Sequence, residues 1–200
     1  MTLSAEEWSA RYVSGDSPWD LGAPHPELVM RIAEGLVPAD AAHRRALVPG
    51  CGRGHDALAL ARAGWLVTAI DFVDPTAGEL GRELEALGGR LLIENALEHS
   101  PDRACDLFFE HTFFCAIDPS LRGRWGELVR RSLAPGGSLC ALVFPVGKPA
   151  SDGGPPYGMT PADMVSALGE PTAIAVDEPV RQGIARRSWP ERWAVLRRAK

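Results

Sequence analysis

Residues 47–56 read LVPGCGRGHD, an apolar stretch followed by three glycines at alternate positions and the start of a helical segment. Gly50, Gly52 and Gly54 let the backbone turn sharply and approach a ligand closely, and the helix start offers free N–H groups. A dinucleotide fingerprint would need a glycine where His55 stands, so a pyrophosphate ligand is disfavoured. The G-x-G-x-G pattern fits better with S-adenosylmethionine, which carries no phosphate.

The next apolar stretch, LVTAID at residues 66–71, ends in Asp71, which lies 19 residues after Gly52. A strand here would place a carboxylate at its C-terminal end, where it can accept hydrogen bonds from both hydroxyls of a ribose. The alternative is a helix cap or a turn residue. In combination with the glycine turn, the position of Asp71 favours the ribose role.

Short β-rich runs alternate with helical segments from residue 46 onward. The expected strands and helices are, in order, 46–50, 55–65, 66–72, 75–89 and 90–94. Such alternation predicts crossover helices and a parallel sheet. Residues 106–114, DLFFEHTFF, are nearly all apolar, as a central strand covered on both faces should be. On that strand Phe113 and Phe114 would point to opposite faces, so at most one of them would line a pocket.

The C-terminal half continues the pattern. A helix is expected at about 119–133 and a strand at 138–146, after an APGG turn. Residues 172–180 and 186–198 predict two more strands, which we expect to form an antiparallel hairpin at the edge of the sheet.

Two short helices are expected before the first strand. Ser4 and Glu7 form a capping-box pattern, and the helix that they open places Trp8 and Tyr12 four residues apart on one face. With Trp19, three aromatic side chains precede the sheet. They either attach the N-terminal helices to the sheet or line a ligand pocket.

Residues 145–159, PVGKPASDGGPPYGM, are too rich in proline and glycine for regular structure. A loop of this length in a compact domain is usually functional or disordered. Tyr157 is its only polar aromatic residue, and it either orients an acceptor or packs on the core. Thr160 and Pro161 restart a helix as its N-cap and first residue.

The composition is that of a globular protein and predicts one domain spanning residues 1–200, with 46% apolar and 24% charged residues. A net charge of −5 argues against nucleic acid as a partner, and the excess of bases in residues 181–200 suits a solvated element. No apolar run reaches the length of a membrane span, and no signal peptide is recognisable, so we expect a cytoplasmic protein. Four scattered cysteines predict reduced, mostly buried thiols, and the Cys and His spacing predicts no metal site. The acidic composition and modest size suit a monomer.

Five stretches carry a specific resemblance: SPWDLG, LVPGCGRGHD, FFEHTFFCAIDP, LAPGG and GGPPYG. In their order and spacing they resemble the thiopurine methyltransferase-like family, most closely its halide/thiocyanate/thiol methyltransferase branch, from Trp8 to about Trp193. The resemblance implies a class I methyltransferase, Rossmann-like α/β fold. Its mostly parallel seven-stranded sheet would have an antiparallel C-terminal edge. An N-terminal helical lid would occupy residues 1–45 and a substrate loop residues 145–160.

The same resemblance implies site residues. The cofactor positions are Trp8, Tyr12, Trp19, Gly50, Cys51, Gly52, Asp71, Phe72, Asn95, Ala96, Glu110 and His111. The substrate positions are Trp8, Trp19, Phe113, Phe114 and Tyr157, with Tyr157 as the catalytic residue that orients the acceptor or takes its proton through water. Asn95 stands where the family often has an aspartate that binds adenine, and its side-chain oxygen can still accept a hydrogen bond. His111 is either a buried hydrogen-bonding residue or a substrate contact.

The implied reaction is in-line transfer of a methyl group from S-adenosylmethionine to a small thiol, sulfide, thiocyanate or halide, with S-adenosylhomocysteine as product and no metal. Aromatic walls would face the sulfonium and strip water from the acceptor. A thiol needs no strong base, because part of it is already ionised near neutrality. The alternatives are an O- or N-methyltransferase of a larger biosynthetic metabolite, and a catalytically idle cofactor-binding module.

Overall fold

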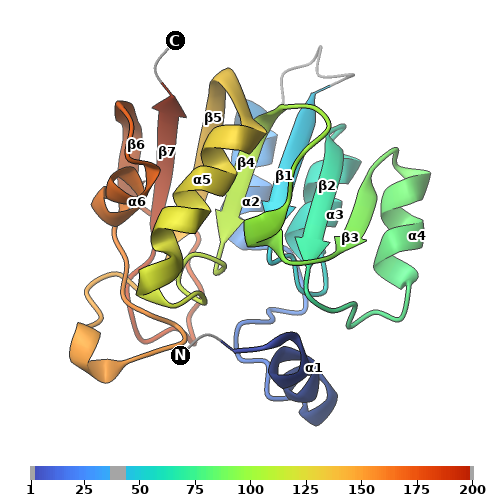
Figure 1. The fold of residues 1–200 in the computed structure, drawn as a ribbon, viewed down its shortest axis with the longest axis horizontal. Coiled ribbons are helices and arrows are strands. Elements are labelled where there is room, and N and C mark those ends of the chain that lie inside the picture. Colours follow the sequence, from blue (N-terminus) through green and yellow to red (C-terminus); the bar gives the residue numbers. More distant parts are fainter. Residues whose placement is uncertain (1–2, 37–43, 199–200) are drawn as a thin grey trace.

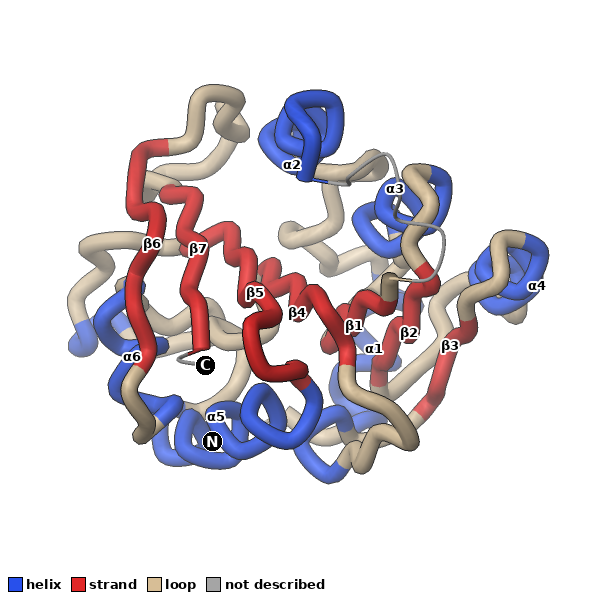
Figure 2. Tube along the Cα trace, turned by 90° about the horizontal axis from the view of Figure 1, so that it is seen from above, coloured by secondary structure: helices blue, strands red, loops and turns tan. Residues whose placement is uncertain are grey.

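The computed structural model describes residues 3–36 and 44–198, in which seven strands form one sheet with helices on both faces (Figures 1 and 2). The strand order is β3-β2-β1-β4-β5-β7-β6. The strands are β1 (Arg45–Pro49), β2 (Leu66–Asp71), β3 (Arg90–Ile93), β4 (Cys105–His111), β5 (Leu133–Val143), β6 (Thr172–Pro179) and β7 (Arg192–Arg198). Strands β1 to β5 run parallel, whereas β7 pairs antiparallel with both β5 and β6. The predicted fold class, including its antiparallel C-terminal edge, is confirmed.

Within the described residues, six α-helices connect or flank these strands. They are α1 (Ala5–Ser14), α2 (Pro26–Arg31), α3 (His55–Arg62), α4 (Glu79–Ala86), α5 (Arg122–Ser132) and α6 (Pro161–Leu168). Shorter helical turns are η1 (Ile32–Leu36), η2 (Ala96–Glu98), η3 (Pro119–Leu121) and η4 (Ala150–Asp152). The predicted capping box of Ser4 and Glu7 is present, and Thr160 caps α6 with Pro161 in its first turn.

Both faces of the sheet are covered, which explains why the central strands are mostly apolar. On one face α2, α3 and α4 pack against the sheet, and on the other face lie α5 and α6 (Figure 2). The neighbouring residues Phe108 and Phe109 of β4 are both fully buried, one in each of the two hydrophobic clusters. Burial on both faces therefore removes the polar alternation expected of a half-exposed strand.

Strand β4 ends earlier than the sequence predicts. Thr112 adopts a left-handed backbone conformation with φ 65°, which turns the chain out of the sheet just after His111. The prediction of a strand through residue 114 was wrong at this end. Phe113 and Phe114 therefore lie in a turn, and strand alternation does not decide where they point. Strand β5 begins earlier than the sequence predicts, because its pairing with β4 already starts at Leu133.

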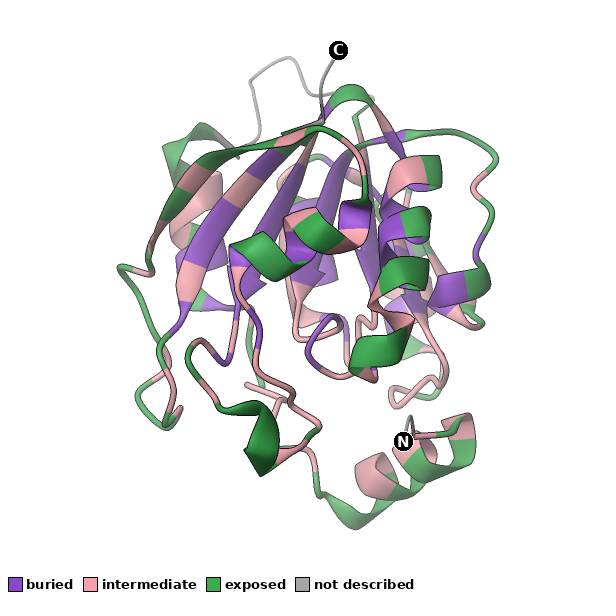
Figure 3. Ribbon diagram, turned by 60° about the vertical axis from the view of Figure 1, so that its left-hand side comes forward, coloured by how far each residue is buried: buried purple, intermediate pink, exposed green. Residues whose placement is uncertain are grey.

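The two N-terminal helices have different positions. Helix α2 packs on the sheet through the fully buried Leu28, whereas α1 contains no buried residue and lies beyond the carboxyl ends of the parallel strands (Figures 1 and 3). Part of the segment expected to form the lid, residues 37–43, lies outside the described residues. No helix in the described ranges is both long and apolar enough to cross a membrane.

The order of the strands in the sheet predicts where a ligand binds. Strand β1 pairs with β2 on one side and with β4 on the other, so the chain connections lead away in opposite directions from this point. In open parallel sheets the crevice at the carboxyl ends of such strands is the usual ligand site.

Candidate active site

A cavity of about 360 Å³ opens at the carboxyl ends of β1, β2 and β4, and residues of α1 contribute to its lining. This volume is within the range of about 300–1,000 Å³ that is common for small-molecule sites. Seven of the lining residues are aromatic: Trp8, Tyr12, Trp19, Phe72, Phe113, Phe144 and Trp189. The charged lining residues are Arg11, Asp71, Glu94, Arg186 and Arg187.

The glycine turn forms one wall, and its backbone requires glycine, as Gly50 and Gly52 show. Gly50 lines the cavity at φ 59°, and a Cβ atom there would lie 2.6 Å from Cδ2 of Phe113. Gly52 has φ 54°, and its Cβ would lie 2.9 Å from the hydroxyl oxygen of Tyr12. Cys51 lies between them and is not among the lining residues. Burial raises the pKa of the Cys51 thiol well above its ordinary value, so this thiol stays protonated.

Asp71 is held at the end of β2 by two backbone N–H groups. Its Oδ2 accepts a hydrogen bond of 2.7 Å from Gly52 N, and its Oδ1 accepts one of 3.3 Å from Val73 N. Burial raises the pKa of the Asp71 carboxyl, while these N–H groups oppose the shift. A carboxylate has about four acceptor positions, so Asp71 can still accept hydrogen bonds from a ligand in the cavity that it lines. Phe72 lines the cavity next to it, as the sequence predicts for a cofactor position.

The three N-terminal aromatic residues converge on one wall. The ring of Trp19 meets Trp8 at a centroid distance of 5.1 Å and Tyr12 at 5.6 Å, both nearly perpendicular. Nε1 of Trp19 donates a hydrogen bond to the Tyr12 hydroxyl at 3.3 Å. The Arg11 guanidinium lies 4.4 Å from the Trp19 ring centroid. All four line the cavity, so these rings cover it as well as attaching α1 to the sheet.

The two phenylalanines after β4 separate in the structure. Phe113 lines the cavity, whereas Phe114 is fully buried against Trp125, with ring centroids 4.6 Å apart. Glu110 holds this turn from below, because its Oε1 accepts hydrogen bonds from the N–H groups of both phenylalanines at 2.8 and 2.9 Å. Its Oε2 accepts one from Nε1 of Trp125 at 3.0 Å, and burial raises the pKa of Glu110 to about 7. Phe114 and Glu110, which the resemblance implies as substrate and cofactor positions, do not line the cavity, because both side chains are buried in the core.

Two further predicted positions lie beside the cavity without lining it. Asn95 caps η2, because its Oδ1 accepts a hydrogen bond of 3.0 Å from Leu97 N, and its neighbours Glu94 and Ala96 line the cavity instead. Tyr157 is half-buried, and its ring lies so near Gly154 that a Cβ there would be 2.5 Å from Cγ of the tyrosine. The expected catalytic hydroxyl is therefore not at the cavity wall, although Pro155 and Pro156 of the same loop are.

His111 belongs to a buried network that the sequence does not reveal. Its Nδ1 lies 2.6 Å from Oδ2 of Asp56, and its Nε2 lies 3.0 Å from Nη2 of Arg187. Burial lowers the pKa of His111, so the neutral ring donates to Asp56 and accepts from Arg187. Arg187 also pairs with Glu191, whose Oε1 lies 3.0 Å from Nε2 of the fully buried His25. His111 therefore positions Arg187, which lines the cavity while His111 does not.

The connection between β6 and β7 also lines the cavity, a contribution that the sequence does not predict. Arg186, Arg187, Ser188 and Trp189 line the cavity from this connection, and the Arg187 guanidinium lies 4.3 Å from the Phe144 ring centroid. The available signal was the excess of basic residues after position 180, which a solvated strand explains equally well. In the described ranges no group of three or more His, Cys, Asp or Glu side chains is placed to hold a metal ion.

Comparisons with known proteins agree with this geometry. A family model described as Thiopurine S-methyltransferase (TPMT) matches residues 3–85 and 91–196. The chain is 32% identical over 169 residues to a probable thiol methyltransferase 2 of Arabidopsis thaliana, covering 82% of this chain and 72% of that protein. It is also 32% identical over 160 residues to thiocyanate methyltransferase 1 of Brassica oleracea, covering 78% of this chain and 68% of that protein.

A solved structure shares the fold. It is the 1,6-didemethyltoxoflavin-N1-methyltransferase of Burkholderia thailandensis, crystallised with its substrate and S-adenosylhomocysteine. The similarity covers 98% of this chain and 87% of that one, with a TM-score of 0.77 and 17% sequence identity. At this identity the likeness establishes the architecture, and the acceptor has to be inferred from the cavity itself.

Proposed function

The chain belongs to the thiopurine S-methyltransferase family and is an S-adenosylmethionine-dependent methyltransferase, and we propose that it is of the thiol methyltransferase type, with a small sulfur nucleophile or a halide as its acceptor. The observation that carries the proposal is the cavity wall, in which seven aromatic residues and one deeply buried arginine, Arg187, line the same space. The walls would exclude water, and the arginine would attract an anion.

The residues at the carboxyl ends of β1 and β2 fit the cofactor. Gly50 leaves room that a Cβ would fill, Asp71 can accept from ribose hydroxyls, and Ala96 leaves space beside β3. When bound, S-adenosylmethionine supplies a methyl group on a positively charged sulfur. Aromatic faces such as that of Trp19 favour a cation beside them, and they exclude water from the attacking atom.

The acceptor side of the cavity offers an anion site without a strong base. Arg187 has five N–H donors, of which one is used by His111 and one by Glu191. The remaining donors are available to a thiolate, thiocyanate or halide. The carboxylates in the lining are Asp71 and Glu94, and both belong to the region that we assign to the cofactor. An acceptor that is already ionised fits this arrangement better than an alcohol, which needs a base.

A labelled-methyl assay tests the proposal directly. The protein is incubated with S-adenosylmethionine labelled in the methyl group and with thiocyanate, sulfide, an aromatic thiol or iodide, beside a larger aromatic alcohol and amine. We expect methylated product from one or more of the small anions. Methylation of the larger molecules alone would identify the alternative, an O- or N-methyltransferase. Calorimetric binding of S-adenosylhomocysteine without any product would identify an idle binding module.

Replacing Gly50 by alanine is expected to weaken S-adenosylhomocysteine binding at least tenfold. The added Cβ would need φ 59° and would lie 2.6 Å from the Phe113 ring, so the turn has to move where it approaches the ligand. The matched control is Gly64→Ala, because Gly64 also has a positive φ, of 95°, but no atom within 4 Å of its Cβ position. Both variants should lose about 1 kcal/mol of stability from the backbone strain alone. Equal calorimetric affinities of the two variants would contradict the assignment.

A further inference from the structure

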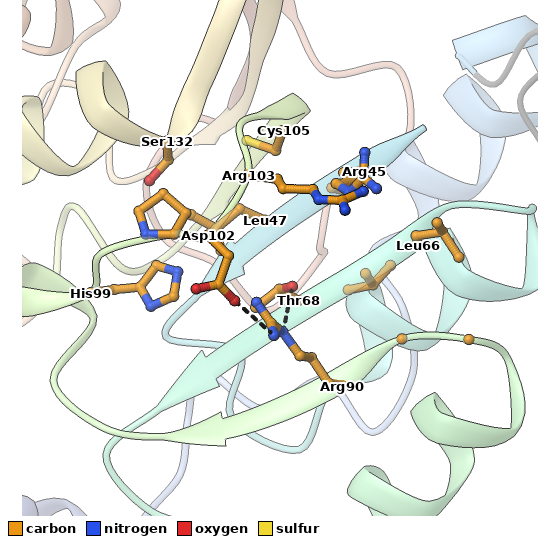
Figure 4. A pocket seen from close by; sticks show the side chains of 15 residues that line it. Arg45, Leu47, Leu66, Thr68, Arg90, His99, Asp102, Arg103, Cys105 and Ser132 are labelled. Atoms are coloured by element: carbon orange, nitrogen blue, oxygen red, sulfur yellow. Dashed lines mark hydrogen bonds and ion pairs between the residues drawn. The ribbon is translucent and has the colours of Figure 1, made fainter. Parts of the chain in front are cut away.

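A second cavity, of about 290 Å³, lies at the opposite edge of the sheet, where the parallel strands begin (Figure 4). We call it the amino-edge pocket. Its lining comes from the starts of β1 and β2, the turn before β3, the segment before β4 and the end of α5, and none of its lining residues lines the candidate active site. The residues are Arg45, Ala46, Leu47, Leu66, Val67, Thr68, Gly88, Gly89, Arg90, His99, Pro101, Asp102, Arg103, Cys105 and Ser132.

The amino-edge pocket carries an excess of positive charge. Three arginines line it, together with one acid, Asp102. Asp102 pairs with Arg90 at 3.6 Å, and Nε of Arg90 donates to Oγ1 of Thr68 at 3.2 Å. Among the described residues, the guanidinium groups of Arg45 and Arg103 have neither an ion pair nor a hydrogen bond. Two cationic side chains in the lining of the same cavity thus form no ion pair among the described residues.

Two buried polar atoms on the cavity wall also have unused hydrogen-bonding capacity. Nε2 of His99 and Oγ of Ser132 have no hydrogen-bond partner within the described ranges, although the residues are only 6% and 1% exposed. The His99 ring is fixed from its other side, because Nδ1 lies 2.5 Å from Oε1 of Glu94. In Figure 4 both side chains lie on the side of the pocket away from Arg45. A buried polar group without a partner costs about 1–3 kcal/mol, so a ligand that supplied partners would be favoured.

We propose that the amino-edge pocket binds a small oxyanion of the phosphate class, such as a phosphomonoester. A phosphate has several acceptor oxygens, which match the planar N–H forks of arginine, and it can also accept from a histidine N–H and a serine hydroxyl. The cavity is larger than a phosphate group alone, so it leaves room for a small organic substituent. A halide ion is too small, and thiocyanate too narrow, to reach donors on several sides of the pocket at once.

Calorimetry with inorganic phosphate tests the proposal on the full chain. Because the candidate active site also carries arginines, the titration is done with that site saturated by S-adenosylhomocysteine, and chloride keeps the ionic strength constant. We expect saturable binding with one phosphate per chain. The double variant Arg45→Gln, Arg103→Gln should bind phosphate at least about tenfold more weakly, because two charge-assisted contacts are lost.

Two controls separate this site from general charge effects. The double variant Arg62→Gln, Arg82→Gln removes the same charge from α3 and α4, outside both cavities, and should bind phosphate as the unaltered chain does. Arg187→Gln, in the candidate active site, should also retain phosphate binding. Absence of saturable binding, or binding that survives the loss of Arg45 and Arg103, would overturn the proposal. Loss of binding in the Arg187 variant would place the phosphate in the other cavity and would overturn it equally.

Discussion

Replacing Arg187 by glutamine is expected to lower kcat/KM for thiocyanate or a thiolate about hundredfold, while S-adenosylhomocysteine affinity stays within about threefold. The side chain is 7% exposed, so its charge acts in a poorly solvated part of the cavity, where a contact with an anion is worth more than in water. The cofactor region at Asp71 does not depend on this arginine in the structure. Steady-state kinetics and calorimetry on the same preparation separate the two effects.

The hydrogen-bond network around Arg187 means that this substitution also affects stability. Removing the guanidinium leaves Glu191 with only His25 and the Ile184 N–H as partners and leaves Nε2 of His111 without its donor, so some loss of thermal stability is expected. Arg187→Lys keeps the charge but not the planar fork, and it should recover part of the activity. Arg192→Gln is the matched control, because Arg192 lies on β7 in an ion pair with Asp177, outside the cavity. Unaltered kcat/KM in Arg187→Gln would contradict an anion site at this wall.

The parts of the site that lie within one strand and its following turn were predictable from the sequence. Gly50 and Asp71 depend on local rules, because a glycine turn after one strand and a carboxylate after the next must meet at the same edge of a parallel sheet. The same holds for Trp8 and Tyr12, which one helical turn brings to one face. The sheet itself followed from the alternation of apolar runs with helical segments.

The parts that depend on contacts between distant segments were not predictable. Arg187 meets His111 across 76 residues of sequence, and no periodicity relates the two. At most one of Phe113 and Phe114 was expected to line a pocket, and only Phe113 does, but the turn that separates them follows from the left-handed conformation of Thr112, for which a threonine gives no signal. Tyr157 was assigned by the motif around it, whereas its orientation is set by the close approach of Gly154 within the loop. In each case packing decided a position that residue type alone left open.

Replacing Glu110 by glutamine is expected to destabilise the fold, and by more at pH 5 than at pH 7.5. The side chain is fully buried and accepts three hydrogen bonds, from the N–H groups of Phe113 and Phe114 and from the indole of Trp125. A glutamine can accept only through one of its two ends, so its NH₂ group must face at least one of these donors. Leaving a buried donor without an acceptor costs about 1–3 kcal/mol. The turn that places Phe113 over Gly50 should loosen, so kcat should fall as well.

The pH dependence follows from the protonation of Glu110 itself. Burial raises the pKa of its carboxyl from 4.5 to about 7, so between these values the folded chain holds a proton that the unfolded chain has released. The protonated Glu110 carboxyl therefore contributes its full stabilisation to the native chain below about pH 4.5, and this contribution declines as the pH rises towards 7. Glutamine does not titrate, so the difference in unfolding free energy between the two chains should narrow over this range, by up to about 3 kcal/mol.

Denaturant unfolding at several pH values measures this difference. The control is Glu85→Gln, at an exposed position on α4, whose effect on the unfolding free energy should not depend on pH. The difference in unfolding free energy between the native and Glu110→Gln chains could instead widen as the pH rises. That result would contradict a raised pKa, and it would mean that the three hydrogen-bond donors stabilise the ionised carboxyl more than burial disfavours it. Glu110 would then hold the turn next to the active site as a carboxylate that accepts three charge-assisted hydrogen bonds. The loss of stability in Glu110→Gln would in that case be largest near neutral pH, where the native carboxyl is fully ionised. The direction in which this free-energy difference changes with pH thus shows whether the protonated or the ionised form of Glu110 positions Phe113.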